Sequence, residues 1–168
     1  PSSDYTDFVE GLRPIQNEDN TIGFKRQDGI FKAFCAKAVK DTENNYVFII
    51  DEINRGEISK IFGELFYSIE PSYRGQKGKI QTQYQNLVAV DDIFNDGFYV
   101  PENVYVIGTM NDIDRSVESM DFAMRRRFTF KEVTAEDRID DILNNDVLGQ
   151  LSEESISKIK FKLRNLNK

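Results

Sequence analysis

The sequence predicts an α/β domain built around a parallel β-sheet. Two five-residue runs of mainly β-branched and aromatic residues, Tyr46–Ile50 and Val104–Gly108, lack the polar alternation of a strand with one face in water. Such runs are typical of strands buried on both faces of a parallel sheet. The sequence around the first run carries apolar residues at helical spacing, and strands alternating with amphipathic helices indicate an α/β fold.

Residues 1–29 are polar and rich in turn-forming residues, apart from an apolar patch between Phe8 and Leu12. This pattern predicts a short helix followed by a loop or hairpin. In the next segment the apolar residues recur at the offsets of one helical face. They are Ile30, Phe31, Phe34, Cys35, Ala38 and Val39. We expect a helix here, capped by Asp28 or Gly29.

A second amphipathic helix is expected after the first strand, because apolar residues again follow helical spacing until Pro71 ends the pattern. They are Ile58, Ile61, Phe62, Leu65, Phe66 and Ile69. Residues 72–98 are polar and contain three of the ten glycines. Since they show only a weak strand pattern, at residues 87–90, we expect a surface hairpin or loop.

The last third of the chain predicts a short helix at residues 119–126 and a third strand at residues 128–133. The residues after it are highly charged, and their apolar members follow a helical pattern. The α/β unit is therefore expected to cover residues 1–134, and residues 135–168 the start of a separate helical subdomain.

The composition restricts the chemistry that the chain can perform. Histidine is absent and Cys35 is the only cysteine, which excludes an internal disulfide, a His-based zinc site and a Ser-His triad. The net charge of −7 and the pI near 4.8 argue against nucleic-acid binding by phosphate neutralisation alone. Contact with DNA is therefore expected from other domains. No run approaches the roughly 18–20 apolar residues of a membrane span, and a cytoplasmic location is expected.

Two acidic residues, Asp51 and Glu52, follow the first strand directly. Ligands of open parallel sheets bind at the carboxyl ends of the strands, so these side chains are expected at a site. A strand-end aspartate can hold Mg²⁺ through its water shell, and the glutamate beside it can orient and deprotonate a water that attacks a phosphate. An ordinary acidic loop start explains the same two residues, and the pair by itself does not decide between the two interpretations.

Asn111 and three successive arginines, Arg125, Arg126 and Arg127, are further candidates. Asn111 closely follows the second strand, where its amide can hydrogen-bond an attacking water or a phosphate oxygen, although turns after strands also use asparagine. Three successive arginines cannot all face one way on a helix. One of them can therefore reach a phosphoryl group bound by a neighbouring subunit, or they can stabilise the end of the helix dipole.

Three segments in this order carry the pattern of a known family. They are Val47–Gly56 (VFIIDEINRG), Val106–Ser116 (VIGTMNDIDRS) and Met120–Phe128 (MDFAMRRRF). They resemble the Walker B strand, the sensor 1 signature and the arginine-finger helix of the McrB-type AAA+ nucleotide hydrolases. Residues 5–11 and 28–31 also resemble the segments that precede the Walker B strand of that family, so the likeness covers the whole predicted α/β unit.

The resemblance implies a partial AAA+ P-loop core, with a parallel sheet flanked by helices, followed by the start of a helical lid subdomain. It also implies a hexameric, ring-forming GTPase that drives a nuclease subunit against DNA carrying modified cytosine. Other domains contact the DNA, and no membrane is involved. Mg²⁺ and GTP are the implied cofactors, and ATP is the alternative nucleotide.

The resemblance also assigns roles to single residues. Asp51 matches the Mg²⁺-binding aspartate, Glu52 the catalytic glutamate and Asn111 the sensor 1 residue. Asn54, in the Asn-Arg continuation of the first motif, is expected to assist at the attacking water.

The remaining assignments concern the subunit boundary. Asp114 and Arg115 match the signature Asp-Arg pair, which is expected beside the nucleotide where two subunits meet. Arg126 is the first choice for the arginine finger, Arg127 the second and Arg125 the third.

The sequence departs from the family in one respect, since it contains no Gly-x-x-x-x-Gly-Lys-Ser/Thr loop. In the family this phosphate-binding loop is expected upstream of Pro1, so the chain by itself is expected to bind nucleotide weakly or not at all. Two alternatives to a McrB-type GTPase remain. One is an ATP-using AAA+ protein of the MoxR or midasin-like kind, and the other is a non-catalytic ring or scaffold subunit.

Overall fold

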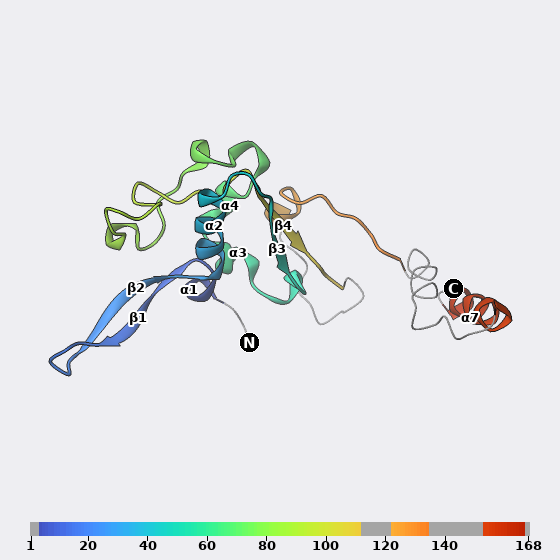
Figure 1. The fold of residues 1–168 in the computed structure, drawn as a ribbon. Helices are drawn as coiled ribbons and strands as arrows, with labels where there is room; N and C mark the ends of the chain where they lie inside the picture. Colours follow the sequence, from blue (N-terminus) through green and yellow to red (C-terminus); the bar gives the residue numbers. More distant parts are fainter. Residues whose placement is uncertain (1–3, 112–121, 135–152, 167–168) are drawn as a thin grey trace. The chain divides into compact units, whose positions relative to one another are not determined.

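The computed structural model describes residues 4–111, 122–134 and 153–166 (Figure 1). They belong to two compact units, residues 1–128 and 129–168, and each unit is described by itself. The first unit holds the parallel strand pair and every predicted site residue that the structure describes.

The parallel sheet of the first unit is formed by β3 (Tyr46–Ile50) and β4 (Val104–Gly108). The strands pair in parallel from their first residues to their last. Both strands agree with the sequence prediction, and the α/β fold class is confirmed. Because the strands run in parallel and end together, the residues after Ile50 and after Gly108 start from the same edge of the sheet.

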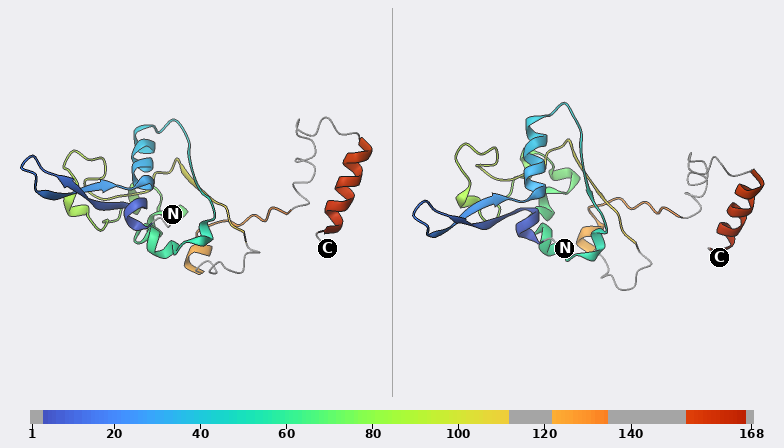
Figure 2. Two further views of the ribbon diagram at one scale, coloured as in Figure 1. Left: turned by 90° about the horizontal axis from the view of Figure 1, so that it is seen from below. Right: turned by 60° about the horizontal axis from the view of Figure 1, so that its bottom comes forward.

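The helix α2 (Ile30–Lys40) lies along one face of the strand pair (Figure 2). Phe48 of β3 packs edge-on against Phe31 and Phe34 of this helix, with ring centroids 5.1 Å apart in both cases. Burial of such rings stabilises a small core because it removes apolar surface from water. The edge-to-face arrangement of the rings adds a further favourable interaction. The predicted helix is confirmed, and its N-cap is Gly29, one of the two residues expected there.

The other face of the strand pair is open among the described residues. Val47 and Ile49 of β3 are 49% and 65% exposed, and Tyr105 and Ile107 of β4 are 53% and 50% exposed. The prediction that these strands are buried on both faces is therefore wrong for this structure. Successive side chains of a strand point to opposite faces, and the described helices cover only one of them.

The second predicted helix is broken in the middle. α3 (Ile58–Phe62) and α4 (Leu65–Ser68) are separated at Gly63, whose φ is 49°. A right-handed helix needs a negative φ, and glycine adopts a positive φ at no steric cost. The apolar spacing identified the buried face correctly, since Phe62 and Leu65 are both buried, but it did not reveal the break.

The N-terminal segment forms a short helix and a hairpin. α1 (Tyr5–Phe8) is capped by Asp4, whose side chain accepts a hydrogen bond from Asp7 N–H at 3.0 Å. β1 (Glu10–Gln16) then pairs antiparallel with β2 (Ile22–Asp28). Of the loop or hairpin that the sequence predicts, the hairpin forms, and it extends away from the rest of the first unit (Figures 1 and 2).

The long polar segment after α4 is a packed loop that contains 3₁₀ turns. They are η2 (Pro71–Tyr73), η3 (Gln76–Gly78) and η4 (Gln85–Leu87). The strand suggested at residues 87–90 does not form. An isolated antiparallel bridge joins Ile80 to Phe98, and Phe94 and Phe98 are fully buried. A few large side chains therefore hold a mostly polar loop on the core.

After β4 the structure describes α5 (Phe122–Arg125) in the first unit and α7 (Glu153–Leu166) in the second. The third strand predicted at residues 128–133 is wrong, because this segment is neither strand nor helix. A strand needs a neighbour for its backbone groups, and no described strand pairs with it. The first part of the predicted 119–126 helix lies outside the described residues. No described helix is long and apolar enough to cross a membrane.

A buried ion pair fixes the base of the hairpin to α2. Lys32 Nζ lies 2.6 Å from Glu10 Oε2, and both side chains are completely buried. Burial favours a higher pKa for Glu10, but hydrogen bonds from Lys32, Thr82 and the Tyr84 N–H outweigh it and lower the pKa. Ionised Glu10 therefore stabilises the fold above its unfolded pKa of about 4.3. This stability is lost as the pH falls through the lower pKa of the folded state.

We expect Glu10→Gln to lower the free energy of unfolding by about 3 kcal/mol or more, because it leaves the buried Lys32 ammonium without its closest counter-charge. Urea unfolding followed by circular dichroism measures this loss. The matched control is Asp7→Asn, which breaks an exposed ion pair with Arg13 and should cost less than about 1 kcal/mol. Equal losses in the two variants would contradict the role of the buried pair.

Candidate functional site

The backbone turns sharply at Glu52, two residues after β3. Glu52 has φ 52° and ψ 48°, in the left-handed helical region, which costs a residue with a side chain roughly 1–2 kcal/mol. The 3₁₀ turn η1 (Ile53–Arg55) follows. The turn keeps the chain at the carboxyl end of the strand pair, where Asp51 and Glu52 are both exposed.

Backbone hydrogen bonds tie this turn to the residues after β4. The Thr109 N–H donates to the Ile50 carbonyl at 2.9 Å, and the Thr109 carbonyl accepts from the Ile53 N–H at 2.8 Å. Gly108 permits the close approach, since a Cβ at this position would lie 2.9 Å from Ile53 Cδ1. The ends of β3 and β4 are therefore joined directly.

Side chains add further contacts between the two strand ends. The Thr109 hydroxyl donates to Asp51 Oδ1 and accepts from the Glu52 N–H at 3.1 Å. Asn54 is buried, and its Nδ2 donates to the Asn111 carbonyl at 3.4 Å, across 57 positions of the sequence. The structure thus brings together the two acids and the two asparagines that the sequence predicts at the site.

Two residues beside the acids are not among the predicted site residues. Arg55 Nη2 lies 3.1 Å from Glu52 Oε1, with these side chains 58% and 45% exposed, and Thr109 contacts both acids as described. The i,i+3 spacing of Glu52 and Arg55 was the available signal for the first of them. The signal for Thr109 was its place directly after the second strand.

The donor set at the strand ends decides which kind of metal site is possible. Within the described part of the chain, no group of three or more His, Cys, Asp and Glu side chains could hold a metal ion. Asp51 and Glu52 therefore do not form an all-protein cage. A single strand-end carboxylate such as that of Asp51 is compatible with Mg²⁺ bound together with a nucleotide, because such an ion takes one or two carboxylates and completes its shell with water and phosphate oxygens.

The three arginines at the end of α5 are placed differently from one another. Met124 is fully buried and anchors the helix. Arg127 donates to two backbone carbonyls of its own chain, at 2.6 Å each, and its guanidinium carbon lies 5.3 Å from the centroid of the Phe66 ring. Arg125 and Arg126 are exposed, so these two are accessible to a neighbouring molecule.

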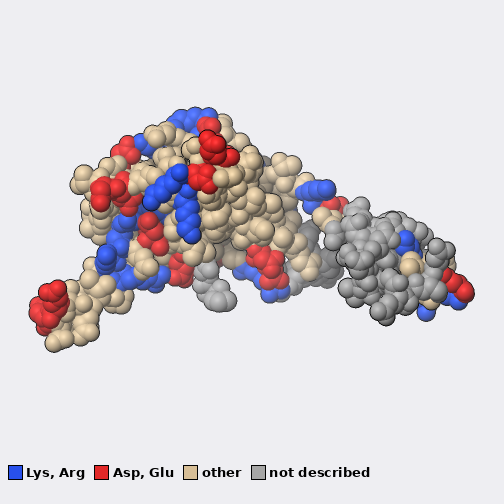
Figure 3. Space-filling model, in the orientation of Figure 1, with Lys and Arg blue, Asp and Glu red and all other residues tan. Residues whose placement is uncertain are grey.

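The other residues predicted at the subunit boundary, Asp114 and Arg115, lie outside the described residues. Charge on the face drawn in Figure 3 is mixed, since basic and acidic side chains lie side by side over the described part of the first unit. The acidic group at the far end of the hairpin in this view belongs to the turn between β1 and β2, which contains Glu18 and Asp19. The drawn face therefore presents no continuous basic surface in its described part.

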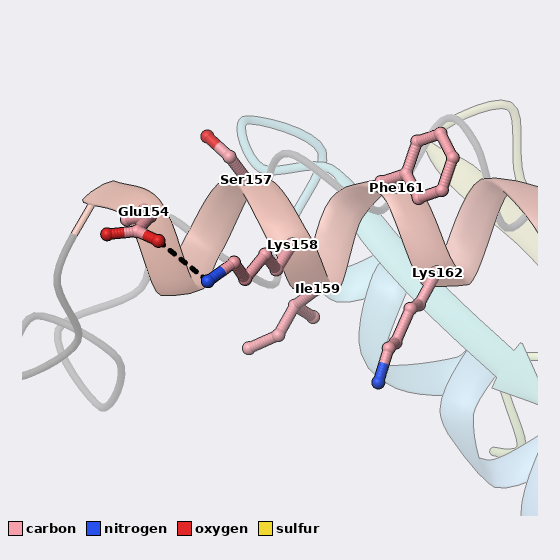
Figure 4. Close-up of a pocket in the computed structure, with 6 residues that line it drawn as sticks. All are labelled: Glu154, Ser157, Lys158, Ile159, Phe161 and Lys162. Carbon is pink, nitrogen blue, oxygen red and sulfur yellow. Dashed lines mark hydrogen bonds and ion pairs between the residues drawn. The ribbon is translucent and has the colours of Figure 1, made fainter.

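A hollow also lies along α7 of the second unit (Figure 4). It is lined by Glu154, Ser157, Lys158, Ile159, Phe161 and Lys162. Its polar contact is an i,i+4 ion pair between Lys158 and Glu154, at 2.6 Å, of a kind that is ordinary on helix surfaces. A hollow whose lining comes from one helix does not enclose a ligand, so the candidate site is the one at the ends of β3 and β4.

Two parallel strands that end in Asp-Glu and in Thr-x-Asn, with exposed arginines at the end of α5, define an α/β protein whose candidate site lies at the carboxyl edge of its parallel sheet. The family model of the AAA domain (dynein-related subfamily) matches residues 5–128. The chain belongs to this family, and the parallel pair with α2 on one face is part of its α/β core.

The chain is also similar to components of two restriction enzymes. It is 46% identical over 132 residues to the Type IV methyl-directed restriction enzyme EcoKMcrB subunit of Escherichia coli (strain K12), covering 79% of this chain and 26% of that protein. It is 28% identical over 138 residues to the Type II restriction enzyme BsuMI component YdiS of Bacillus subtilis (strain 168), covering 80% of this chain and 38% of that protein. The chain is thus of the McrB type of AAA+ protein, and it spans well under half the length of either relative.

Proposed function

We propose that the chain is the water-activating part of a ring-forming nucleoside triphosphatase. Glu52 orients and deprotonates the attacking water, and Asp51 holds Mg²⁺ through its shell of water and phosphate oxygens. Asn111 hydrogen-bonds the water or a terminal phosphate oxygen, while Asn54 positions the Asn111 backbone. When bound, Mg²⁺ would neutralise charge on the transferring phosphoryl group.

The observation that carries the proposal is the hydrogen-bonded junction between the ends of β3 and β4. It brings the Asp51 and Glu52 carboxylates and the Asn111 backbone to the edge where parallel sheets bind ligands. An acidic loop start and an ordinary turn explain each strand end separately. Neither explains why Thr109 and Asn54 join the two ends across more than fifty residues.

The proposed nucleotide is GTP, and the proposed setting is a restriction complex that acts on DNA carrying modified cytosine. Support comes from the similarity to the EcoKMcrB subunit, whose name describes a methyl-directed restriction enzyme. On the same ground we propose a nuclease subunit as partner, with DNA contacted by other domains. We also propose assembly into a hexameric ring, in which the exposed Arg126 can act on the nucleotide of the next subunit.

A competition assay on the whole protein that contains this chain tests the nucleotide. With Mg²⁺ and labelled GTP bound, unlabelled GTP should compete at least about tenfold more strongly than ATP, a difference of about 1.4 kcal/mol in binding free energy. The 168-residue chain alone is the control. Without a phosphate-binding loop it should bind neither nucleotide more tightly than about millimolar.

Each other outcome of this assay has a definite meaning. Stronger competition by ATP would show that the protein uses ATP, as AAA+ proteins of the MoxR or midasin-like kind do, and that the proposed GTP preference is wrong. If the whole protein hydrolyses neither nucleotide, the non-catalytic scaffold is the better interpretation. Micromolar binding by the 168-residue chain would show that the phosphate site has been placed wrongly.

A further inference from the structure

Thr109 is the residue of the second strand end that contacts both acids of the candidate site. Its hydroxyl has one proton to donate and lone pairs to accept. The proton is directed at Asp51 Oδ1, and the oxygen accepts the Glu52 N–H at 3.1 Å. One side chain therefore holds the carboxylate of the first acid and the backbone of the second.

The Glu52 backbone needs such support because it is strained. A left-handed conformation at a residue with a side chain persists only where the surroundings enforce it, and residues of this kind gather at functional sites. The Glu52 N–H is bound by the Thr109 hydroxyl, and the next N–H, of Ile53, is bound by the Thr109 carbonyl. Thr109 thus accepts hydrogen bonds from the backbone N–H groups on both sides of the Glu52 α-carbon, one with its hydroxyl and one with its carbonyl.

We propose that Thr109 is a positioning residue of the hydrolytic site, which orients the Asp51 carboxylate and holds the left-handed turn that presents the Glu52 side chain. The inference rests on the proposed function for its catalytic consequence, but not for its geometry. Catalysis by a general base requires placement within hydrogen-bond reach of the water, so a turn that relaxes should slow the chemical step more than it weakens nucleotide binding.

The geometry is tested by amide hydrogen exchange in the 168-residue chain. Thr109→Val keeps the shape of the side chain and removes both hydrogen bonds, so exchange in the segment 51–54 should become about threefold faster or more. Thr109→Ser keeps the hydroxyl and should behave as the unchanged chain. Tyr105→Phe, which removes a hydroxyl from an exposed residue of the neighbouring strand β4, is the matched control. Unchanged exchange in Thr109→Val would overturn the proposal.

The catalytic consequence is tested in the whole protein, with Glu52→Gln measured beside the Thr109 variants. Thr109→Val should lower kcat by about tenfold or more while the dissociation constant for nucleotide with Mg²⁺ changes by less than about threefold. Thr109→Ser should restore kcat to within about threefold. Thr109→Ala, which adds no apolar surface, should match Thr109→Val, and thermal melting should show that all variants are folded.

The outcomes separate the inference from the function on which it rests. If Glu52→Gln is inactive and Thr109→Val turns over normally, the positioning role is wrong and the proposed function stands. If Thr109→Ser is as slow as Thr109→Val, the hydroxyl is not the group that matters, and the inference is also wrong. If Glu52→Gln turns over normally, the proposed function fails, and the exchange experiment alone still decides whether Thr109 holds the turn.

Discussion

Glu52→Gln in the whole protein should slow nucleotide hydrolysis by about 10² or more and leave the binding of nucleotide and Mg²⁺ nearly unchanged. Glutamine has the size of glutamate but cannot take a proton from the attacking water. The loss should therefore appear in kcat rather than in KM. Steady-state hydrolysis and titration with a fluorescent nucleotide measure the two quantities.

Two further variants separate the effect of losing the Glu52 carboxylate from the effects of the charged groups near it. Glu57→Gln removes a nearby exposed carboxylate, one that pairs with Lys60, and should leave hydrolysis within about twofold. Arg55→Ala breaks the ion pair with Glu52 and shows how much of the effect comes from that contact. Normal turnover by Glu52→Gln would exclude the proposed Walker B role.

Arg126→Ala should reduce hydrolysis by about 10³ or more, because an arginine supplied to a transferring phosphoryl group is worth about 10³ to 10⁵ in rate. Nucleotide binding by isolated protomers should change little, since the proposed target is the nucleotide of the neighbour. Mixing the Arg126→Ala and Glu52→Gln proteins should restore part of the activity. In a mixed ring an Arg126→Ala protomer keeps its own Glu52 and receives an arginine from its partner.

The neighbouring arginines provide the comparison for this experiment. Arg125→Ala removes the neighbouring exposed arginine, the last residue of α5, and a greater loss there than in Arg126→Ala would assign the finger to Arg125. Arg127→Ala should lower the melting temperature, because Arg127 is bound to its own backbone and packs on Phe66. If mixed rings form but stay as inactive as either variant alone, the action across the subunit boundary is wrong. The helix-dipole interpretation of the arginines would then be preferred.

Much of the candidate site could be predicted from the sequence because its residues stand directly after two strands. The bounds of β3 and β4 follow from short apolar runs, and parallel strands place their carboxyl ends at one edge. Asp51 and Asn111 could therefore be assigned to a shared site before their contacts were known. The break at Gly63 could not be predicted in the same way, because the apolar spacing continues through it and only the backbone φ reveals it.

The sequence by itself determined the α/β class, the helix α2, the two strands and the residue types at their ends, because these depend on patterns within a few neighbouring residues. Only the tertiary structure decided which face of the sheet is covered, that the Thr109 hydroxyl joins both acids, and that Arg127 is held while Arg126 is exposed. The contacts of Thr109 with Asp51 and of Arg127 with Phe66 span 58 and 61 positions. Packing brings such partners together, and no local spacing encodes them.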